Sequence, residues 1–445
     1  MPQVAPFRGL GFALDRYARA TTPERVRLPG EPAQHPGRIA DLTDVVCPPY
    51  DVINDAQRTE LLARDPHNAV RVELNPEPDP YAAAAEALAT WRRDGALDER
   101  EAPSVYYYAH ARSTDPDEPT VQGVVCRVLL EPWGGEVRPH EHTMPGPKAD
   151  RLALLTSTRT QLSPILTVYF DRSARYRHVM GRAWSDEWRA RDGDGLLHQL
   201  AAVEPDARLL GYLGRQRLFI ADGHHRYETA LAYQAQVREA AADVPLGELA
   251  ADWIMMVLVN AEAEELEIRP THRLLQGVDV DGLRSLVRDP GPLFEVIPVA
   301  PTDLALALEE RAGVEEPVFG VVLPGDEGYL LVGDADLVAD RMRRERTSTA
   351  VRNLDLAVLH AAVLDDRLGI DAAAVAGGER LLYTRDAHDA IARVQRGEVS
   401  AALLVRPTPL HQLAAVATAG DVMPQKSTYF YPKLLTGMVF NPLED

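Results

Sequence analysis

The chain has 445 residues, 46% of them hydrophobic and 26% charged, which is typical of a folded protein with two or three domains. Its formal net charge of −20 argues against general binding to nucleic acid or to a membrane surface, because both partners are polyanions. Two cysteines, Cys47 and Cys126, are too few for a disulfide framework or a Cys-rich metal site. A single disulfide bond between them is compatible with the sequence. A cytoplasmic location is the default expectation, because no signal peptide and no apolar run of about 18 residues is seen.

The first part of the chain reads as a mixture of helices and strands. Several short strands precede the next helix and no regular βαβ repeat is present, which favours an α+β domain with a mixed sheet. Strands are expected at 69–74, 105–111, 122–130, 161–170, 208–213, 218–221 and 253–259. Helices are expected at 56–64, 80–94, 152–158, 176–192 and 224–241.

The composition shifts near residue 276, after which no dense polar cluster appears before about residue 400. Strands at 380–385 and 401–405 alternate with helices at 387–396 and 410–417, which predicts a second α/β domain. The expected domains are therefore 1–275, which carries the catalytic motifs, and 276–418. The segment 419–445 is rich in aromatic residues, and we expect it to fold back onto the pocket.

The stretch 217–231 is the strongest candidate for a functional centre. An apolar run from Leu218 runs into Asp222-Gly-His-His-Arg226, and a helical pattern follows at once, which indicates a strand, a tight turn and a helix. A helix start presents unpaired N–H groups and the positive end of its dipole, which suits a phosphate. Gly223 allows close approach of the backbone. The expected phosphate-binding residues at the turn are Gly223, His224, His225 and Arg226.

A second cluster, His140-Glu-His-Thr143, places two imidazoles and a carboxylate within four residues. Such a cluster suits proton transfer or a divalent metal ion, but the spacing is not that of the His-Glu-x-x-His metalloproteases. We count His140, Glu141 and His142 as candidate catalytic residues, with a solvated polar loop as the alternative. Lys148 and Arg151 follow near the start of a helix and are candidate phosphate ligands.

Of the 47 basic residues only three are lysines, and all three lie in motif-like segments. Arg does not replace Lys well where a compact charge meets a phosphate. We therefore count all three, Lys148, Lys426 and Lys433, as candidate phosphate ligands or substrate contacts. The alternative is that three surface lysines remain by chance where the others have been replaced by arginine. Lys426-Ser-Thr lacks the glycines of a Walker A motif, so Ser427 is only a candidate pocket residue.

Two further segments supply candidate pocket residues. Pro48-Pro49 fixes an extended backbone from which Tyr50 and Asp51 would project, with a simple strand terminator as the alternative. Thr271, His272 and Arg273 stand at the exit of a predicted strand and could line the same pocket, although a histidine of this kind is more often structural.

These motifs together resemble the DUF1015 family of prokaryotic proteins. The resemblance rests on Pro48-Pro-Tyr-Asp-Val-Ile53, His140-Glu-His-Thr143 with Lys148 and Asp150-Arg151, Ala221–Ala230, Pro270-Thr-His-Arg273 and Met423–Lys433. The Asp222–Arg226 turn also resembles the phosphate-binding turn of the ParB/sulfiredoxin-like superfamily, which includes free serine kinases. Members of DUF1015 have been linked to phosphorylation of free L-serine. The resemblance therefore implies a ParB/sulfiredoxin-like core.

The function that this resemblance favours is a small-molecule kinase that uses ATP or ADP with Mg²⁺ and converts L-serine to O-phosphoserine. Phosphoryl transfer needs positioning and neutralisation of charge, which the turn and the lysines would supply. The carboxylate that binds Mg²⁺ or takes the hydroxyl proton is left open between Asp222, Glu141 and Glu73. The alternatives are a nucleotide-binding regulatory protein and, with His140, His142 and His224 as ligands, a metal-dependent hydrolase.

Overall fold

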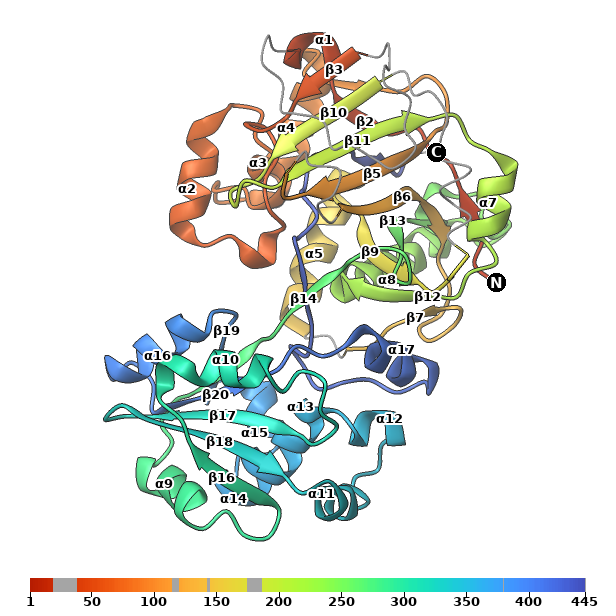
Figure 1. Ribbon diagram of the computed structural model, residues 1–445. Coiled ribbons are helices and arrows are strands. Elements are labelled where there is room, and N and C mark those ends of the chain that lie inside the picture. Colours follow the sequence, from red (N-terminus) through yellow and green to blue (C-terminus); the bar gives the residue numbers. More distant parts are fainter. Residues whose placement is uncertain (19–37, 114–119, 142–144, 174–185, 379, 445) are drawn as a thin grey trace. The chain divides into compact units, whose positions relative to one another are not determined.

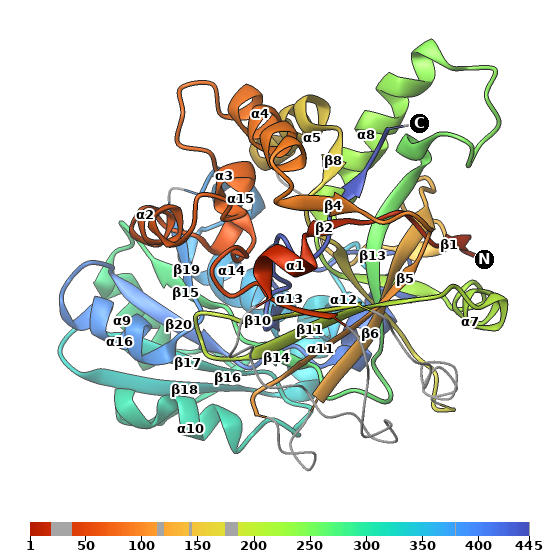
Figure 2. The same ribbon diagram turned by 90° about the horizontal axis from the view of Figure 1, so that it is seen from above.

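The computed structural model describes residues 1–18, 38–113, 120–141, 145–173, 186–378 and 380–444 (Figures 1 and 2). The chain divides into two compact units. Unit 1 comprises Met1–Pro139, Thr143–Leu266 and Pro432–Asp445, and unit 2 comprises His140–His142 and Glu267–Tyr431. Neither unit is one continuous stretch of chain, and the expected boundaries after 275 and 418 fall within the sequence of unit 2.

Unit 1 is built on a ten-stranded mixed sheet, which confirms the expected combination of helices with a mixed sheet. Strand pairs β3–β10, β9–β13 and β7–β12 are parallel, and the other pairs are antiparallel. In sheet order the strands are β3 (Arg38–Asp41), β10 (Asp186–Arg191), β11 (Leu197–Val203), β5 (Val105–Ala111), β6 (Thr120–Leu129), β13 (Trp253–Asn260), β9 (Ile165–Tyr169), β12 (Leu218–Asp222) and β7 (Val137–Arg138), with β1 (Val4–Ala5) on β6.

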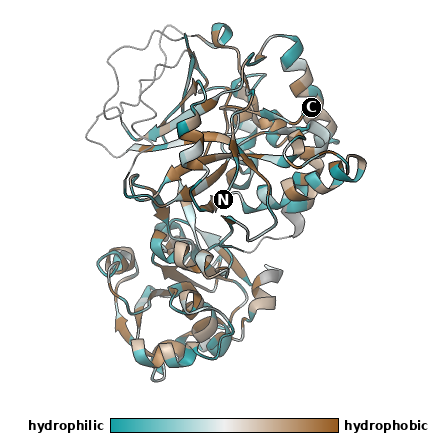
Figure 3. Cartoon of the chain, turned by 90° about the vertical axis from the view of Figure 1, so that its right-hand side faces the viewer, coloured by the Kyte–Doolittle hydropathy of each residue, from teal (hydrophilic) through white to brown (hydrophobic). Residues whose placement is uncertain are grey.

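Both faces of this sheet are covered, so its central strands are almost continuously apolar. On one face Tyr107, Cys126 and Met256 share a core with helices α7 (Ala207–Leu213) and α8 (His224–Ala240). On the other face the N-terminal segment packs, and the Tyr106 hydroxyl accepts a hydrogen bond from the Gly9 amide at 2.9 Å. Figure 3 shows the strands of the sheet as apolar ribbon.

The remaining elements of unit 1 surround this sheet. They are α1 (Leu14–Tyr17), η1 (Tyr50–Val52), α2 (Asp55–Arg64), α3 (Val70–Glu73), α4 (Pro80–Arg93), α5 (Pro145–Thr158), η2 (Ala250–Asp252), β2 (Leu10–Phe12), β4 (Leu97–Glu99), β8 (Thr160–Gln161) and β22 (Asn441–Pro442). Helix α2 begins at a capping box between Asn54 and Gln57, and α4 begins with Asp79 as N-cap and Pro80 in its first turn. The helices expected near 56 and 80 are thus confirmed.

Three local predictions were wrong. Residues 69–74 contain helix α3 instead of a strand, because the Asn68 side chain accepts a hydrogen bond from the Val70 amide and nucleates a turn. Residues 208–213 lie in helix α7, which Asp206 begins by accepting from the Arg208 amide. Residues 186–191 form strand β10, whereas a helix was expected at 176–192; residues 176–185 lie outside the described part of the chain.

Unit 2 contains a six-stranded sheet in which every neighbouring pair is antiparallel. In sheet order the strands are β16 (Phe294–Pro298), β18 (Glu327–Gly333), β17 (Val318–Leu323), β20 (Ala401–Val405), β15 (His272–Leu275) and β19 (Leu381–Thr384). A separate two-stranded sheet joins β14 (Glu267–Arg269) to β21 (Tyr429–Tyr431). Alternate residues of β17 and β20 pack against helices, which gives this unit its own apolar core.

The helices of unit 2 are α9 (Val280–Arg288), η3 (Pro301–Asp303), α10 (Leu304–Glu309), α11 (Ala335–Met342), α12 (Thr349–Arg352), α13 (Asp355–Val358), the π-helical η4 (Leu359–Asp365), α14 (Asp366–Leu368), α15 (Ala372–Gly377), α16 (Ala387–Gln395) and α17 (Leu410–Thr418). Five of them, α9, α11, α12, α15 and α16, begin at an Asp or Ser whose side chain accepts a hydrogen bond from the first turn. Within the described ranges of the whole chain, no helix is both long and apolar enough to cross a membrane.

Candidate functional site

The strand–turn–helix predicted around Asp222 is confirmed. The residues from Leu218 to Ala221 are buried in β12, and Tyr227 and Ala230 of α8 pack into the sheet core. Gly223 is the N-cap of α8 with φ of 99°, a left-handed conformation that favours glycine, and no side chain caps the helix. The first turn of α8 contains no acidic residue. This helix start therefore has the local structure and the polarity of an anion-binding turn.

The register of the sheet changes beside this turn. Strand β12 pairs with β9, and the pairing shifts between Ile220 and Asp222, which marks a β-bulge. A bulge re-aims the following side chain and often lies next to functional groups. Here it precedes the Asp222 carboxylate, which projects from the end of the strand toward two cations.

Asp222 holds one cation on each carboxylate oxygen. Arg226 Nη2 donates to Oδ2 at 2.9 Å, and Lys433 Nζ donates to Oδ1. Burial alone would raise the pKa of Asp222, but Lys433 and Arg226 outweigh it and hold that pKa well below its usual range. Asp222 is therefore ionised at neutral pH and acts as the residue that fixes both cations at the helix start.

Arg226 is fixed by three further contacts. Its Nη1 donates to the Ser163 hydroxyl at 2.8 Å and to the Pro164 carbonyl at 2.7 Å. Its guanidinium also lies over Gly223, where a Cβ atom would meet Nη2 at 3.0 Å. Glycine at 223 is thus required twice, by the backbone conformation and by the position of Arg226.

Glu73 forms the second charged centre of unit 1. One of its carboxylate oxygens, Oε1, accepts from the Tyr50 amide at 3.3 Å and from Arg151 Nη1 at 3.3 Å. Burial raises the pKa of Glu73 above its usual range, although Arg151 and Arg226 partly oppose the shift. Glu73 ends helix α3, the segment for which a strand was expected, so it faces inward because of that helical turn. A buried carboxylate with a raised pKa is suited to accept a proton.

Arg151 connects Glu73 with neighbouring groups. Its guanidinium stacks on the Tyr50 ring at 4.2 Å and forms a salt bridge with Asp150 at 2.5 Å. Burial raises the pKa of Tyr50 to about 12, so this hydroxyl is neutral under ordinary conditions. Tyr81, which the sequence reading did not identify, donates from its hydroxyl to Asp150 at 2.9 Å.

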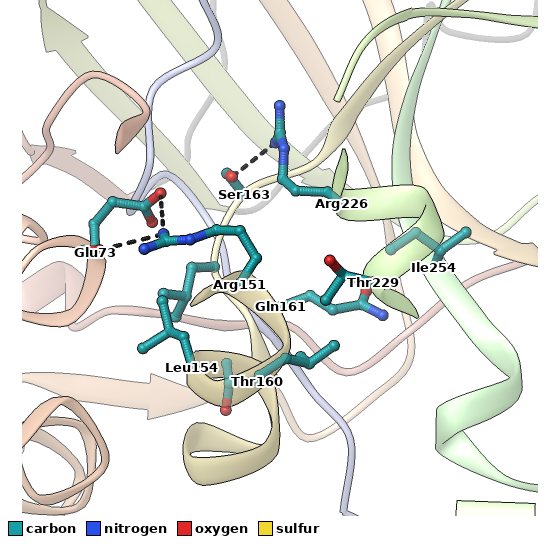
Figure 4. A pocket seen from close by; sticks show the side chains of 11 residues that line it. Glu73, Arg151, Leu154, Thr160, Gln161, Ser163, Arg226, Thr229 and Ile254 are labelled. Atoms are coloured by element: carbon teal, nitrogen blue, oxygen red, sulfur yellow. Dashed lines mark hydrogen bonds and ion pairs between the residues drawn. The ribbon is translucent and has the colours of Figure 1, made fainter. Parts of the chain in front are cut away.

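Two cavities share a wall made by Glu73, Arg151 and Leu154. The first, which Ser163 and Arg226 also line and which we name the inner cavity, has a volume of about 60 Å³ (Figure 4). The second, which Pro80 and Tyr81 also line, has a volume of about 200 Å³. Figure 4 shows the Glu73–Arg151 and Arg226–Ser163 interactions beside the same space. The Asp222 turn and the Glu73 centre therefore border one small cavity through Arg226.

The Thr229 hydroxyl is a buried polar group in the lining of the inner cavity. Thr229, on α8, is buried, and its hydroxyl has no hydrogen-bond partner among the described residues. Gln161, which lines the same cavity, does form hydrogen bonds. Its Nε2 donates to the Trp253 carbonyl at 2.7 Å, and its Oε1 accepts from the Met255 amide at 2.7 Å. Ser163 and Thr229 were not identified from the sequence, which signalled only a strand in this region.

Lys148 lies on α5 and forms a salt bridge with Glu228 of α8, with 2.5 Å between Nζ and Oε2. Its side chain is 40% exposed. Lys148 is therefore attached to the second turn of α8. Asp51 is exposed at η1, next to Tyr50.

A second set of predicted residues comes together within unit 2. His140 Nε2 lies 3.0 Å from the Thr428 hydroxyl, and the Met423 amide donates to the His140 carbonyl at 2.7 Å. Glu141 Oε1 accepts from the Lys426 amide at 2.8 Å. Lys426 itself has φ of 57°, a strained left-handed conformation for a non-glycine residue. The motif at 140 and the motif at 423 are thus parts of one structure.

Arg273 is the buried cation of that structure. It donates to the carbonyl groups of Thr271, Gln425 and Lys426, the last at 3.2 Å, and burial lowers its pKa to about 10. The carbonyls of Gln425 and Lys426 lie just before Ser427, whose hydroxyl donates to the Pro424 carbonyl at 2.5 Å. Arg273 therefore holds the turn that carries Lys426.

His272 lies within strand β15, where its Nδ1 accepts from the Val405 amide at 3.2 Å. Burial lowers its pKa to about 4, and the Arg273 charge acts in the same direction. A neutral histidine that accepts a hydrogen bond from a sheet amide has the features of a structural residue. His272 therefore fits the structural alternative given for it in the sequence analysis.

The predicted site residues divide between the two units. Those of unit 1 are Tyr50, Asp51, Glu73, Lys148, Arg151, Asp222, Gly223, His224, His225, Arg226 and Lys433. Those of unit 2 are His140, Glu141, Thr271, His272, Arg273, Lys426 and Ser427, while His142 lies outside the described residues. Among the described residues no group of three His, Cys, Asp or Glu side chains could hold a metal ion.

The model of a family described as "Protein of unknown function (DUF1015)" matches residues 31–357 of the chain. The chain belongs to the DUF1015 family. The family resemblance expected from the motifs is thus confirmed, whereas the likeness of the turn to the ParB/sulfiredoxin-like superfamily stays a prediction. No curated protein matches the chain.

Several solved structures are similar to the chain at low identity, among them the following three. A free serine kinase variant in complex with AMP is 14% identical, with 70% of this chain and 87% of that chain covered and a TM-score of 0.36. A conserved hypothetical protein from Pyrococcus furiosus is 15% identical, with 71% and 94% covered and a TM-score of 0.34. A truncated SbnI from Staphylococcus aureus is 13% identical, with 70% and 85% covered and a TM-score of 0.35. Such similarities do not establish a shared function.

Proposed function

We propose that this protein is a small-molecule kinase that transfers a phosphoryl group from ATP or ADP to the hydroxyl of free L-serine. The observation that carries the proposal is the turn at Gly223, where Asp222 holds Lys433 and Arg226 beside the uncapped start of α8. Phosphoryl transfer depends on positioning and on neutralisation of phosphate charge, and this turn offers both.

The nucleotide phosphates would bind at the start of α8. The first N–H groups of a helix have no acceptor within the helix, and the dipole adds positive potential there. Lys433 and Arg226 add two charges that the Asp222 carboxylate holds in place. An arriving phosphate would share these cations with Asp222, so little side-chain rearrangement is needed on binding.

Glu73 is the best proton acceptor of the three carboxylates considered. The low pKa of Asp222 makes it a weak base, and its oxygens are engaged by two cations. Glu141 accepts from the Lys426 amide in unit 2. Glu73 has a raised pKa and borders the inner cavity that Arg226 also lines. A base whose pKa lies nearer the working pH is the more effective catalyst.

In the proposed reaction the serine oxygen attacks the terminal phosphorus of the nucleotide while its proton passes to Glu73. The bond from that phosphorus to the bridging oxygen breaks, and its electron pair leaves on the shortened nucleotide. Lys433 and Arg226 would offset the charge that develops on the transferred group.

Mg²⁺ would arrive with the nucleotide phosphates. Asp222 and Glu141 were the expected protein ligands, but Asp222 already pairs with two cations and Glu141 accepts from a backbone amide. The carboxylates as arranged therefore do not fit a dedicated protein site for Mg²⁺, and the charge neutralisation is assigned to the basic side chains.

The direct test is to incubate the purified protein with ATP or ADP, Mg²⁺ and L-serine and to measure O-phosphoserine by mass spectrometry. A panel of other small hydroxyl metabolites is run in parallel to identify the acceptor. Product from serine supports the proposal. Nucleotide binding without any phosphorylated product would favour the regulatory alternative, and absence of both would refute the kinase assignment.

A matched pair of variants tests the role of Glu73. Glu73→Gln keeps a hydrogen-bond acceptor but cannot take a proton, and we expect kcat to fall by about 10²–10⁴-fold with a smaller change in KM. Glu77→Gln, at an exposed position four residues away, is the control and should leave kcat unchanged. In the unmodified protein kcat should rise with pH through the raised pKa of Glu73, a dependence that Glu73→Gln removes.

A further inference from the structure

Trp133 differs from the other described tryptophans in its exposure. Its side chain is 37% exposed, whereas Trp91, Trp188 and Trp253 are 4%, 5% and 9% exposed. A single exposed apolar side chain needs no special explanation on most surfaces. Trp133 stands apart because the turn that carries it and the residues beneath it are fixed by specific contacts.

The turn from Glu131 to Glu136 is closed by its own hydrogen bonds. The Gly135 amide donates to the Pro132 carbonyl at 3.1 Å, and the Glu136 amide donates to Glu131 Oε2 at 2.7 Å. Gly134 has φ of 85°, which the tight turn requires. Trp133 is therefore presented on a compact turn between β6 and β7.

Helix α8 anchors this turn. The buried Tyr227 hydroxyl donates to the Glu131 carbonyl at 2.9 Å and lies 3.2 Å from the Glu131 amide, which donates to it. The Trp133 ring lies 5.9 Å from the Tyr227 ring and 6.4 Å from the His224 ring, with interplanar angles of 53° and 58°. One side of the indole is thus packed against the first turn of α8, directly after Gly223, while part of the ring stays open.

We propose that Trp133 is a stacking platform for the base of the nucleotide whose phosphates bind at the start of α8. This inference rests on the proposed function, because it assigns the base end of the same ligand. An aromatic face binds any nucleobase by stacking, without hydrogen-bond readout, and does not attract inorganic phosphate. Trp133 therefore distinguishes a nucleotide from a bare polyphosphate chain.

The test compares ATP with inorganic tripolyphosphate, both titrated calorimetrically into the full chain and into two variants. Trp133→Ala removes the platform, and we expect ATP to bind about tenfold more weakly or worse while tripolyphosphate affinity is unchanged. Trp133→Phe keeps an aromatic face and should retain most of the affinity for ATP. Trp133→Phe also serves as the folded reference if Trp133→Ala proves unstable.

Fluorescence gives an independent readout, because a stacked base changes the emission of the indole that it covers. We expect ATP, but not tripolyphosphate, to quench part of the emission of the unmodified protein. That component should be missing in Trp133→Phe, which still binds ATP.

Three outcomes would overturn the inference, and they separate it from the function. Equal ATP affinity in Trp133→Ala and the unmodified protein would refute the platform and leave the kinase proposal intact. An equal loss for ATP and tripolyphosphate would mean that Trp133 only supports the turn. Failure of the unmodified protein to bind either ligand would refute both proposals.

Discussion

Lys433 Nζ donates to Asp222 Oδ1, although 211 residues separate the two in sequence. The pair is largely shielded from solvent, with side-chain exposures of 10% for Lys433 and 20% for Asp222. This contact attaches the segment after Tyr431 to the end of β12 and delivers a lysine to the Gly223 turn. The prediction that residues 419–445 fold back onto the pocket stays a prediction, and within unit 1 Lys433 is the residue of that segment that contacts Asp222.

Replacing Lys433 by Met leaves the buried Asp222 charge with Arg226 as its main partner. We expect a loss of about 3 kcal/mol in the free energy of unfolding and loss of nucleotide binding. A double-mutant cycle with Asp222→Asn, followed by chemical denaturation, measures the coupling between the two residues. A coupling energy near zero would show that the pair does not stabilise the fold.

Gly223→Ala should both destabilise the protein and abolish activity. The left-handed backbone costs about 1–2 kcal/mol for an alanine, and the new Cβ would also displace the Arg226 guanidinium. Gly95→Ala is the matched control, since Gly95 has φ of 73° but no atom within 4 Å of the added Cβ. If both variants keep full activity, the position of Arg226 is not important for function.

Glu264 should make unit 1 less stable as the pH rises. Burial raises the pKa of Glu264 to about 8, against an opposing hydrogen bond from the Gln122 amide. The folded chain therefore keeps this proton to a higher pH than the unfolded chain does. The stability from that proton is fully present below about pH 4.5 and is lost as the pH rises to about 8.

Glu264→Gln removes this titration, so its stability relative to the unmodified protein should grow by about 1.4 kcal/mol per pH unit within that window. Denaturation curves recorded at several pH values check the slope. Glu265→Gln, at the exposed neighbouring position, should show no such trend. A flat difference for Glu264→Gln would mean that Glu264 is ionised in the folded protein.

Thr229→Val tests the hydroxyl that faces the inner cavity. Because this hydroxyl has no partner among the described residues, its replacement by a methyl group should leave the melting temperature unchanged or raise it. Thr158→Val is the contrast, since the Thr158 hydroxyl donates to the Leu154 carbonyl at 2.8 Å and its loss should cost about 1 kcal/mol. A clear destabilisation by Thr229→Val would reveal a hydrogen bond to water in the cavity.

The central turn was predictable because its signals are local. An apolar run, a glycine and a helical pattern stand next to one another between Leu218 and Tyr233, and no distant contact is needed to interpret them. Strand β13, with its continuous apolar run, and the long helix α4 were predictable for the same reason. The DUF1015 membership followed from motifs spread over the chain.

The errors have two physical origins, one local and one long-range. Residues 69–74 alternate like a strand, yet Asn68 turns them into a short helix, and it is that helix which carries Glu73 toward Arg151. The roles of Ser163 and Thr229 depend on which side chains the fold brings to the cavity. No sequence window contains that information for Ser163, because its partner Arg226 is 63 residues away.

The arrangement of the chain also determines the order in which the protein can be completed. Unit 1 needs the residues after Tyr431, and the whole of Glu267–Tyr431 belongs to unit 2. During synthesis, the partly made chain therefore carries Asp222 for another 211 residues before Lys433 emerges from the ribosome. Shortened products that stop within unit 2 would leave the Asp222 carboxylate without its lysine, so the pair of cations at the Gly223 turn would stay incomplete until Lys433 has been made.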